Sequence, residues 1–187
     1  MGLLKRFRRQ EIRADPDETM FEDALLTALL GSGKATKQMA LQVPTVSGGI
    51  DLIANVVAST PVKLYREENG KAIEVPNDPR VRLLNDETGD TLNANEFWHA
   101  MIRDYYTGKG GYAYINRVRG EIRSLHYVDE SRVAVNRNTD AIFKDFDLLV
   151  DGTVYRPFDF LTLLRNTKDG AVGVPITEEN AKLIEVA

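Results

Sequence analysis

The chain has 187 residues, no cysteine and a formal net charge of -4, and this length allows a hydrophobic core without metals or disulfides. The lack of cysteine excludes disulfides, thiolate metal ligands and cysteine nucleophiles. The acidic balance excludes a chain that binds nucleic acid as a whole through a basic surface, and no apolar run approaches the roughly 18 residues of a membrane-spanning helix.

Residues 1–33 are predicted to form an arm that is basic and then acidic. Residues 1–13 hold five basic residues and one acid, and residues 14–30 hold five acids and no base. The beginning lacks the apolar core and cleavage site of a signal peptide, and Arg6 stands where a myristoylation motif needs Ser or Thr. A short helix is expected from about Glu18 to Leu30. The arm is either solvated and poorly ordered, or it docks on a partner or a nucleic-acid phosphate.

The stretch Leu29–Lys37, LLGSGKATK, carries the Gly-Lys pair of a phosphate-binding loop. A Walker loop needs G-x-x-x-x-G-K-[ST], in which backbone N–H groups hold the phosphates and a hydroxyl holds Mg²⁺. Ala28 and Ala35 stand where the first glycine and the hydroxyl should be, and the expected element before the loop is a helix instead of a buried strand. The stretch is therefore interpreted as a linker, with Thr36 as a candidate cap of the next helix.

A helix is predicted over residues 43–57. Pro44 fits its first turn, or a kink after a short preceding turn, and Pro61 stops it. Gly48 and Gly49 each cost up to about 1 kcal/mol against Ala in a helix interior. They indicate close approach by a neighbouring element, with a break in the helix as the alternative. The apolar stripe at spacings of three and four consists of Val43, Val46, Ile50, Ile53 and Val57.

Glycine-containing turns between strand-like runs predict three antiparallel hairpins. Their turns are Asn69-Gly70, Arg119-Gly120 and Asp151-Gly152. Further strand-like runs are SRVAVNR and DFLTLLRN, and a short helix is expected in NDPRVRLLND. With about four helices and six or seven strands, the pattern indicates an α+β fold of hairpins separated by helices, without regular βαβ alternation.

The clearest helix is predicted between Asn93 and Gly108. Asn93 can cap it, and Glu96 three residues later completes a capping box. Its expected buried face consists of Phe97, Trp98, Met101, Ile102 and Tyr105. A last helix begins near Thr177 and keeps helical spacing to Ala187, which suggests a fragment or a natural truncation of something longer.

The catalytic motifs that are common in enzymes are missing from the sequence. His99 and His126 are the two histidines, and without cysteine or H-E-x-x-H spacing they do not indicate a zinc site. No G-x-S-x-G nucleophile elbow is present. The sequence therefore predicts no catalytic, cofactor-binding or metal-binding residue, no cofactor, and a protein that is not an enzyme.

The order of segments from about residue 34 onward resembles the portal proteins of tailed double-stranded DNA bacteriophages. In that family a small-residue helix leads into Ser-x-Pro and a strand ending in Tyr-Arg, and a later helix with Glu-Phe precedes a Gly…Ala-Tyr strand. The matching residues are Ser59, Pro61, Tyr65, Arg66, Glu96, Phe97, Gly110, Gly111, Ala113 and Tyr114. DPRVRLLND, GEIRSLHYVDESRVAV and DGAVGVP are similar to further family segments, although a family histidine is replaced near Thr162 and a family serine is missing at Val174-Pro175.

The resemblance implies the wing-like α+β part of a portal subunit over residues 34–187, truncated before the stem helix, since the family runs to about twice this length. It implies a structural subunit of a head–tail connector ring, usually of twelve copies, at one capsid vertex. Double-stranded DNA is packaged and ejected through the ring without sequence specificity. The implied partners are further copies of the chain, the major capsid protein, the terminase large subunit and head–tail adaptor proteins, with no membrane. The implied locations are the virion and, during assembly, the host cytoplasm.

Two other hypotheses stay open at this point. One is a truncated prophage remnant or another α+β protein-interaction module without catalytic activity. The other is an enzyme that uses the Gly31–Lys34 stretch, which the missing Walker residues disfavour.

Overall fold

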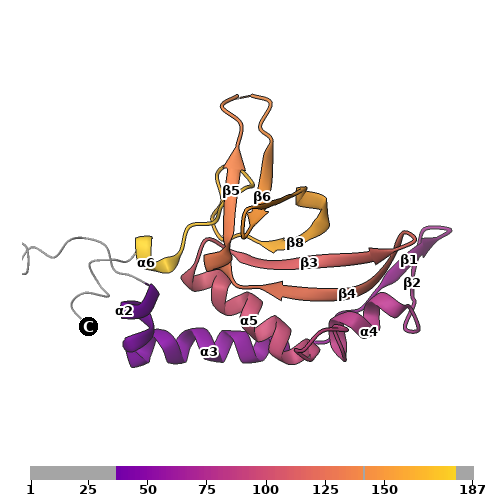
Figure 1. Cartoon of the computed structure of the whole chain (residues 1–187). Coiled ribbons are helices and arrows are strands. Elements are labelled where there is room, and N and C mark those ends of the chain that lie inside the picture. The colour runs from indigo at the N-terminus through magenta and orange to yellow at the C-terminus, as the bar shows by residue number, and fades with distance from the viewer. Residues whose placement is uncertain (1–36, 141, 180–187) are drawn as a thin grey trace, which may run out of the picture. The chain divides into compact units, whose positions relative to one another are not determined.

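The computed structural model describes residues 37–140 and 142–179, and the structural statements below concern these residues (Figure 1). The elements in chain order are α2 (Lys37–Gln42), α3 (Pro44–Ala58), β1 (Tyr65–Glu68), β2 (Lys71–Glu74), α4 (Pro79–Asn85), α5 (Ala94–Thr107), β3 (Gly111–Val118), β4 (Glu121–Val128), η1 (Glu130–Arg132), β5 (Val133–Arg137), β6 (Phe146–Val150), β7 (Thr153–Tyr155), η2 (Pro157–Asp159), β8 (Phe160–Leu163) and α6 (Ile176–Glu179). Helices and antiparallel hairpins are both present, as the α+β prediction requires, but from β3 to β8 only the 3-10 turns η1 and η2 separate the strands.

Several predictions concern residues outside the described ranges. These are the helix over Glu18–Leu30, the interpretation of the Gly-Lys stretch as a linker, and the cap at Thr36. The division into an arm over residues 1–33 and a domain over residues 34–187 also stays a prediction. The expected last helix does begin beside Thr177, in α6, and its continuation lies outside the described residues.

Helix α3 forms where the predicted apolar spacing places it. It follows the short helix α2, and Pro44 stands in its first turn, where the missing N–H forfeits no helical hydrogen bond. The helix runs without interruption through Gly48 and Gly49, so the alternative of a break is wrong. The expected close neighbour is not found among the described residues, because nothing lies within 4 Å of a Cβ built on either glycine.

The buried side of α3 differs from the predicted stripe. Ile50 and Ala54 are buried, because this side of α3 packs on α5. Ile53 and Val57, which belong to the predicted stripe, are exposed. The helical period was therefore correct, but two of the five residues in the stripe are exposed.

Helix α5 begins with the capping box that the sequence predicts. The Asn93 side chain accepts a hydrogen bond from the Glu96 backbone N–H over 2.9 Å, and the Asn93 N–H donates to the Glu96 carboxylate over 3.1 Å. Phe97 and Met101 are fully buried. Trp98 is half-buried and donates its indole N–H to the carbonyl of Leu84 over 2.8 Å. This bond satisfies the one polar atom of the indole and ties α4 to α5.

The three predicted hairpins are confirmed as β1–β2, β3–β4 and β6–β7. Both turn residues of each hairpin have positive φ, as a two-residue turn of type I′ requires. The φ angles are 51° at Asn69, 74° at Gly70, 55° at Arg119, 84° at Gly120, 48° at Asp151 and 84° at Gly152.

The core lies on both faces of the antiparallel sheet β4-β3-β8. On one face, Ala113 and Leu125 pack with Phe97 and Met101 of α5. On the other face, Tyr112 packs with Val133, Leu148 and Phe160 beside the second sheet, β5-β6-β7. Neighbouring residues of a strand point to opposite faces, so β3 places Tyr112 in one half of the core and Ala113 in the other.

The contact between α5 and β3 depends on Gly111. A Cβ at this position would come within 2.5 Å of the Met101 carbonyl oxygen, which no side chain can do without moving the helix. The absence of a side chain therefore lets α5 lie directly on the sheet. The described part of the chain is thus layered, with α3 on α5, α5 on one sheet and a second sheet on the far face (Figure 1).

Candidate functional site

A buried polar cluster joins α2, α5 and β4. Asp104 lies on α5, and its side chain is only 6% exposed. Its carboxylate accepts hydrogen bonds from Lys37 Nζ over 2.8 Å and from the Tyr127 hydroxyl over 2.5 Å. Lys37 also lies 3.3 Å from Glu130 Oε1. The cluster holds α2, and with it the beginning of α3, against the α5–β4 layer.

The electrostatics of this cluster favour a structural role. Burial and the hydrogen bond to Asp104 raise the pKa of Tyr127 far above its ordinary value of 10.0. Burial lowers the pKa of Lys37, but the hydrogen bond and charge of Asp104 outweigh it, so this pKa lies above 10.5. The phenol stays protonated and the ammonium stays charged at neutral pH. Neither group is therefore suited to exchange protons with a substrate.

A second cluster has the order of an acid–base–nucleophile triad. Asp90 Oδ2 lies 3.2 Å from His126 Nδ1, and His126 Nε2 lies 2.8 Å from the Ser124 hydroxyl. However, Ser124 is only 5% exposed. The Gly89 backbone lies so close that a Cβ built there would be 2.9 Å from Ser124 Cβ. Because a nucleophile must reach its substrate, this cluster is a polar tie between β4 and the loop before α5.

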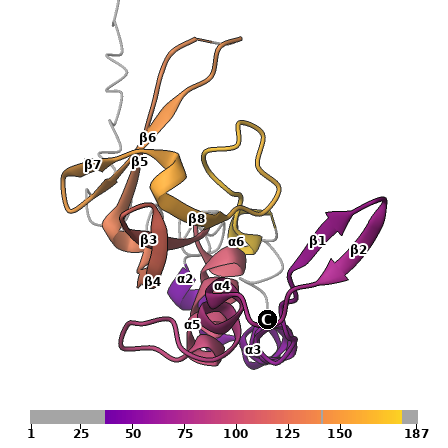
Figure 2. The same ribbon diagram turned by 90° about the vertical axis from the view of Figure 1, so that its right-hand side faces the viewer.

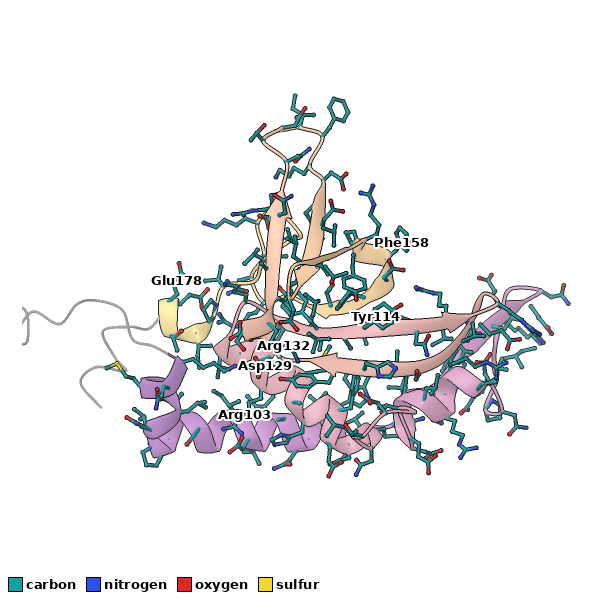
Figure 3. The ribbon with its side chains drawn as sticks, in the orientation of Figure 1. Arg103, Tyr114, Asp129, Arg132, Phe158 and Glu178 are labelled. Carbon is teal, nitrogen blue, oxygen red and sulfur yellow. The ribbon has the colours of Figure 1, made fainter. Side chains whose placement is uncertain are left out.

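His99 lies apart from His126, on the side of α5 that faces α3. His99 Nε2 and Arg103 Nε are both 3.9 Å from Asp51 Oδ1 of α3. Figure 3 labels Arg103. His99 and Arg103 also line a cleft of about 560 Å³, together with Asp90 and Glu96. The cleft mixes acids and bases on its open walls. Within residues 37–140 and 142–179 no group of His, Asp or Glu is placed to hold a metal ion.

The outward side of α3 carries exposed apolar side chains. Leu52 is 66% exposed and Val56 is 60% exposed. With Gly49 and Ile53 they recur at i, i+3, i+4 and i+7, which places them on one side of the helix. We call these four residues the α3 face. None of the helices in the described residues is long and apolar enough to cross a membrane. Exposed apolar side chains that lie together on one side of a helix are typical of interaction surfaces.

The β1–β2 hairpin is a second exposed feature near the end of α3. All eight of its strand residues are exposed, and within the described ranges neither strand pairs with another sheet. Figure 2 shows the hairpin standing away from α3 and α4. Tyr65 and Arg66, two of the residues that carry the family resemblance, lie in its first strand. A lone two-stranded hairpin is only marginally stable in water, so this element also suits a contact surface.

Sequence reasoning missed the exposed side of α3 and the buried carboxylate. Apolar spacing shows that a helix has a stripe, but here the core takes Ile50 and Ala54 and leaves Leu52 and Val56 outside. A signal for Asp104 was present. Phe97, Met101 and Asp104 follow one another at spacings of four and three, which places the Asp104 carboxylate on the buried side of the helix.

Comparison with known proteins decides the family. The model of the family described as phage portal protein matches residues 44–187. The chain belongs to the phage portal protein family. The family resemblance read from the sequence is therefore confirmed. No curated protein in the comparison matched the chain.

Solved structures show the same fold for this member of the portal family. A chain from the neck of an empty gene transfer agent (GTA) particle, computed with C6 symmetry, is 18% identical with a TM-score of 0.60. A chain from the virion of a native GTA particle is 20% identical with a TM-score of 0.57. Each match covers 80% of this chain but only 41% or 40% of the solved chain. The portal chain described here thus spans less than half the length of these relatives, and its α+β class is confirmed.

Proposed function

We propose that this chain is a structural subunit of a phage portal, built into a head–tail connector ring of the virion. The observation that carries the proposal is the family match over residues 44–187. The neck and virion particles from which the similar structures come support a place in a symmetric assembly. The exposed α3 face provides a surface for contacts between subunits.

The proposed ring holds about twelve copies and lets double-stranded DNA pass during packaging and ejection. Passage without sequence specificity does not require tight binding of the DNA phosphates. The net charge of -4 is consistent with a surface along which DNA slides. The further partners are the major capsid protein, the terminase large subunit and head–tail adaptor proteins. The subunit is proposed to reside at one capsid vertex, after assembly in the host cytoplasm, with residues 1–33 as an arm and residues 34–187 as the wing-like domain.

The proposed role involves no catalysis. The cluster around Asp104 and the cluster around His126 are accounted for by burial and by ties between elements. The described residues thus contribute shape and surface to the assembly. A subunit of this kind works by positioning its neighbours and the DNA path.

The experiment that tests the proposal is mass photometry of the purified full chain over a range of concentrations, followed by negative-stain microscopy. The mass of the particles divided by the chain mass of 20.9 kDa counts the copies. Rings with one defined copy number are the expected result. A chain that stays monomeric at every concentration contradicts the ring proposal.

A further inference from the structure

Helix α3 contains two glycines whose free-energy cost no contact within the described residues explains. Gly48 and Gly49 lie inside the helix, where each costs about 1 kcal/mol against Ala. The space beside both is open, so no described element needs their small size. Close to them, Leu52 and Val56 are largely exposed. Glycine beside protruding apolar side chains forms a shallow apolar surface that an outside group can approach closely.

The tip of the β5–β6 hairpin is a projection, in contrast to the shallow apolar surface of α3. Ile142 is 82% exposed and Phe143 is 78% exposed. We call Ile142 and Phe143 the hairpin tip. The hairpin rises from the far face of the sheet β4-β3-β8, away from α5 (Figure 1). It therefore presents two large apolar side chains at the end of a projection.

Hydrogen bonds from the side chains of Asp140 and Asn138 reach the backbone of this tip and of Asp145 near it. The Asp140 carboxylate accepts from the N–H of Ile142 over 2.7 Å and from that of Phe143 over 2.9 Å. The Asn138 amide donates to the Phe143 carbonyl over 2.6 Å and accepts from the Asp145 N–H over 3.0 Å. A projection that is ordered before contact loses less conformational entropy on binding. The tip is thus built to present Ile142 and Phe143.

These two apolar surfaces lie on opposite sides of the layered unit. The α3 face is the outer side of the helical layers, and the hairpin tip extends from the second sheet (Figure 1). A ring forms when one surface of each subunit contacts a different surface of the next, whereas a surface that pairs with itself closes a two-fold dimer. When the two contact surfaces lie on opposite sides of a subunit, each copy is rotated only slightly relative to the one before it. Many copies are then needed to close the ring, so this arrangement suits a ring of many subunits.

We propose that the hairpin tip of one copy of this chain docks on the α3 face of the next copy. The inference rests on the proposed portal function and names the surfaces that build its ring. Neither the α3 face nor the hairpin tip contains a charged residue. A contact between them therefore places no charged side chain of one surface against the other.

Cross-linking tests this contact directly, because the chain has no cysteine of its own. Val56→Cys and Phe143→Cys are prepared as separate proteins, mixed and oxidised, since a disulfide forms only where the two Cβ atoms come within about 4.5 Å. The expected product is the mixed dimer of one chain of each kind. Val118→Cys, an exposed position in the β3–β4 hairpin, serves as the control and is expected to form no such product. A predominant dimer of Val56→Cys with itself overturns the proposal.

Complementary charge variants provide the second test. Leu52→Asp damages the α3 face and Phe143→Asp damages the hairpin tip. Each is expected to raise the concentration for half-assembly at least tenfold, while circular dichroism and thermal unfolding stay unchanged because both side chains are exposed. A mixture of the two retains one intact pair of surfaces and is expected to stop at dimers. Val154→Asp, at an exposed site on β7, is the control and should assemble like the unmodified chain.

The outcomes separate the two proposals. If the unmodified chain forms rings and both charge variants form the same rings, the surfaces are wrong and the portal function stands. If the unmodified chain remains monomeric at every concentration, the ring proposal and the contact fail together. Variants that are monomeric alone and dimeric when mixed establish the contact.

Discussion

Removing the buried carboxylate of Asp104 should destabilise the fold more than removing any exposed acid. Asp104→Ala deletes the acceptor for both Lys37 and Tyr127. Loss of one partner from a buried ion pair costs roughly 3–5 kcal/mol. Lys37 keeps Glu130 at 3.3 Å, and its side chain is 35% exposed, so solvent and the second acid reduce the penalty. We expect a decrease of about 3 kcal/mol in the free energy of unfolding.

Asp104→Asn separates the charge from the hydrogen bond. The amide oxygen can still accept from the Tyr127 hydroxyl, so the expected decrease is only about 1–2 kcal/mol. Urea unfolding at pH 7 measures both values, with the single tryptophan, Trp98, as the fluorescent probe. Glu178→Ala removes an exposed acid and should change stability by less than about 0.5 kcal/mol. If Asp104→Ala also costs less than about 1 kcal/mol, the cluster does not stabilise the fold and the reasoning is refuted.

The same cluster predicts a loss of stability at alkaline pH. The pKa values of Lys37 and Tyr127 are raised above 10.5 and 10.0 in the folded chain. A group with a raised pKa binds its proton more tightly in the folded state, so its contribution is complete below the unfolded pKa and disappears as pH rises through the folded pKa. Unfolding free energies should therefore fall from about pH 10 upward. Tyr127→Phe should reduce the slope of that decrease, and an unchanged slope contradicts the assignment to Tyr127.

Three further substitutions test other features by urea unfolding at pH 7. Asn93→Ala should lower the free energy of unfolding by about 1 kcal/mol because it removes the cap of α5. Asn95, the second residue of α5, is exposed, so Asn95→Ala should have little effect. Equal losses in the two variants contradict the capping role. Tyr112→Phe should raise stability by about 1 kcal/mol, since the Tyr112 hydroxyl is buried without a hydrogen-bond partner in the described residues; a loss of stability contradicts this. Gly49→Ala should stabilise the isolated subunit by about 0.5–1 kcal/mol, as open space surrounds the site, and should weaken ring assembly in mass photometry; a destabilised subunit contradicts the open-space argument.

Local chemistry was enough to predict most elements of this chain. Glycine takes the second turn position of each hairpin, and asparagine or aspartate takes the first position in two of the three, because these residues accept positive φ most readily. Arg119 adopts a positive φ of 55° in the remaining turn, where Gly120 follows it. The pair Asn93 and Glu96 marks the beginning of α5, because both side chains bind backbone groups within one turn. Such signals depend on neighbours in sequence, so they can be read without a structure.

The family was also readable from the order of segments along the chain. No single segment was specific, but the succession of small-residue helix, Ser-x-Pro, strand and capped helix matched the portal pattern. The family match over residues 44–187 confirms it. The order of elements is a property of the linear chain, which explains why it survives at 18–20% identity in the solved relatives.

Tertiary packing decided which side of each element is used. The spacing of valine and isoleucine in α3 defines a stripe, but its orientation depends on where α5 lies, and α5 takes Ile50 and Ala54. Asp104 is an ordinary helix residue until Tyr127, 23 positions away, and Lys37, 67 positions away, surround its carboxylate. Such contacts join residues far apart in sequence, and each depends on all the elements between them. The amino-acid order thus specifies the elements and the family, while packing decides that Leu52 and Val56 stay exposed.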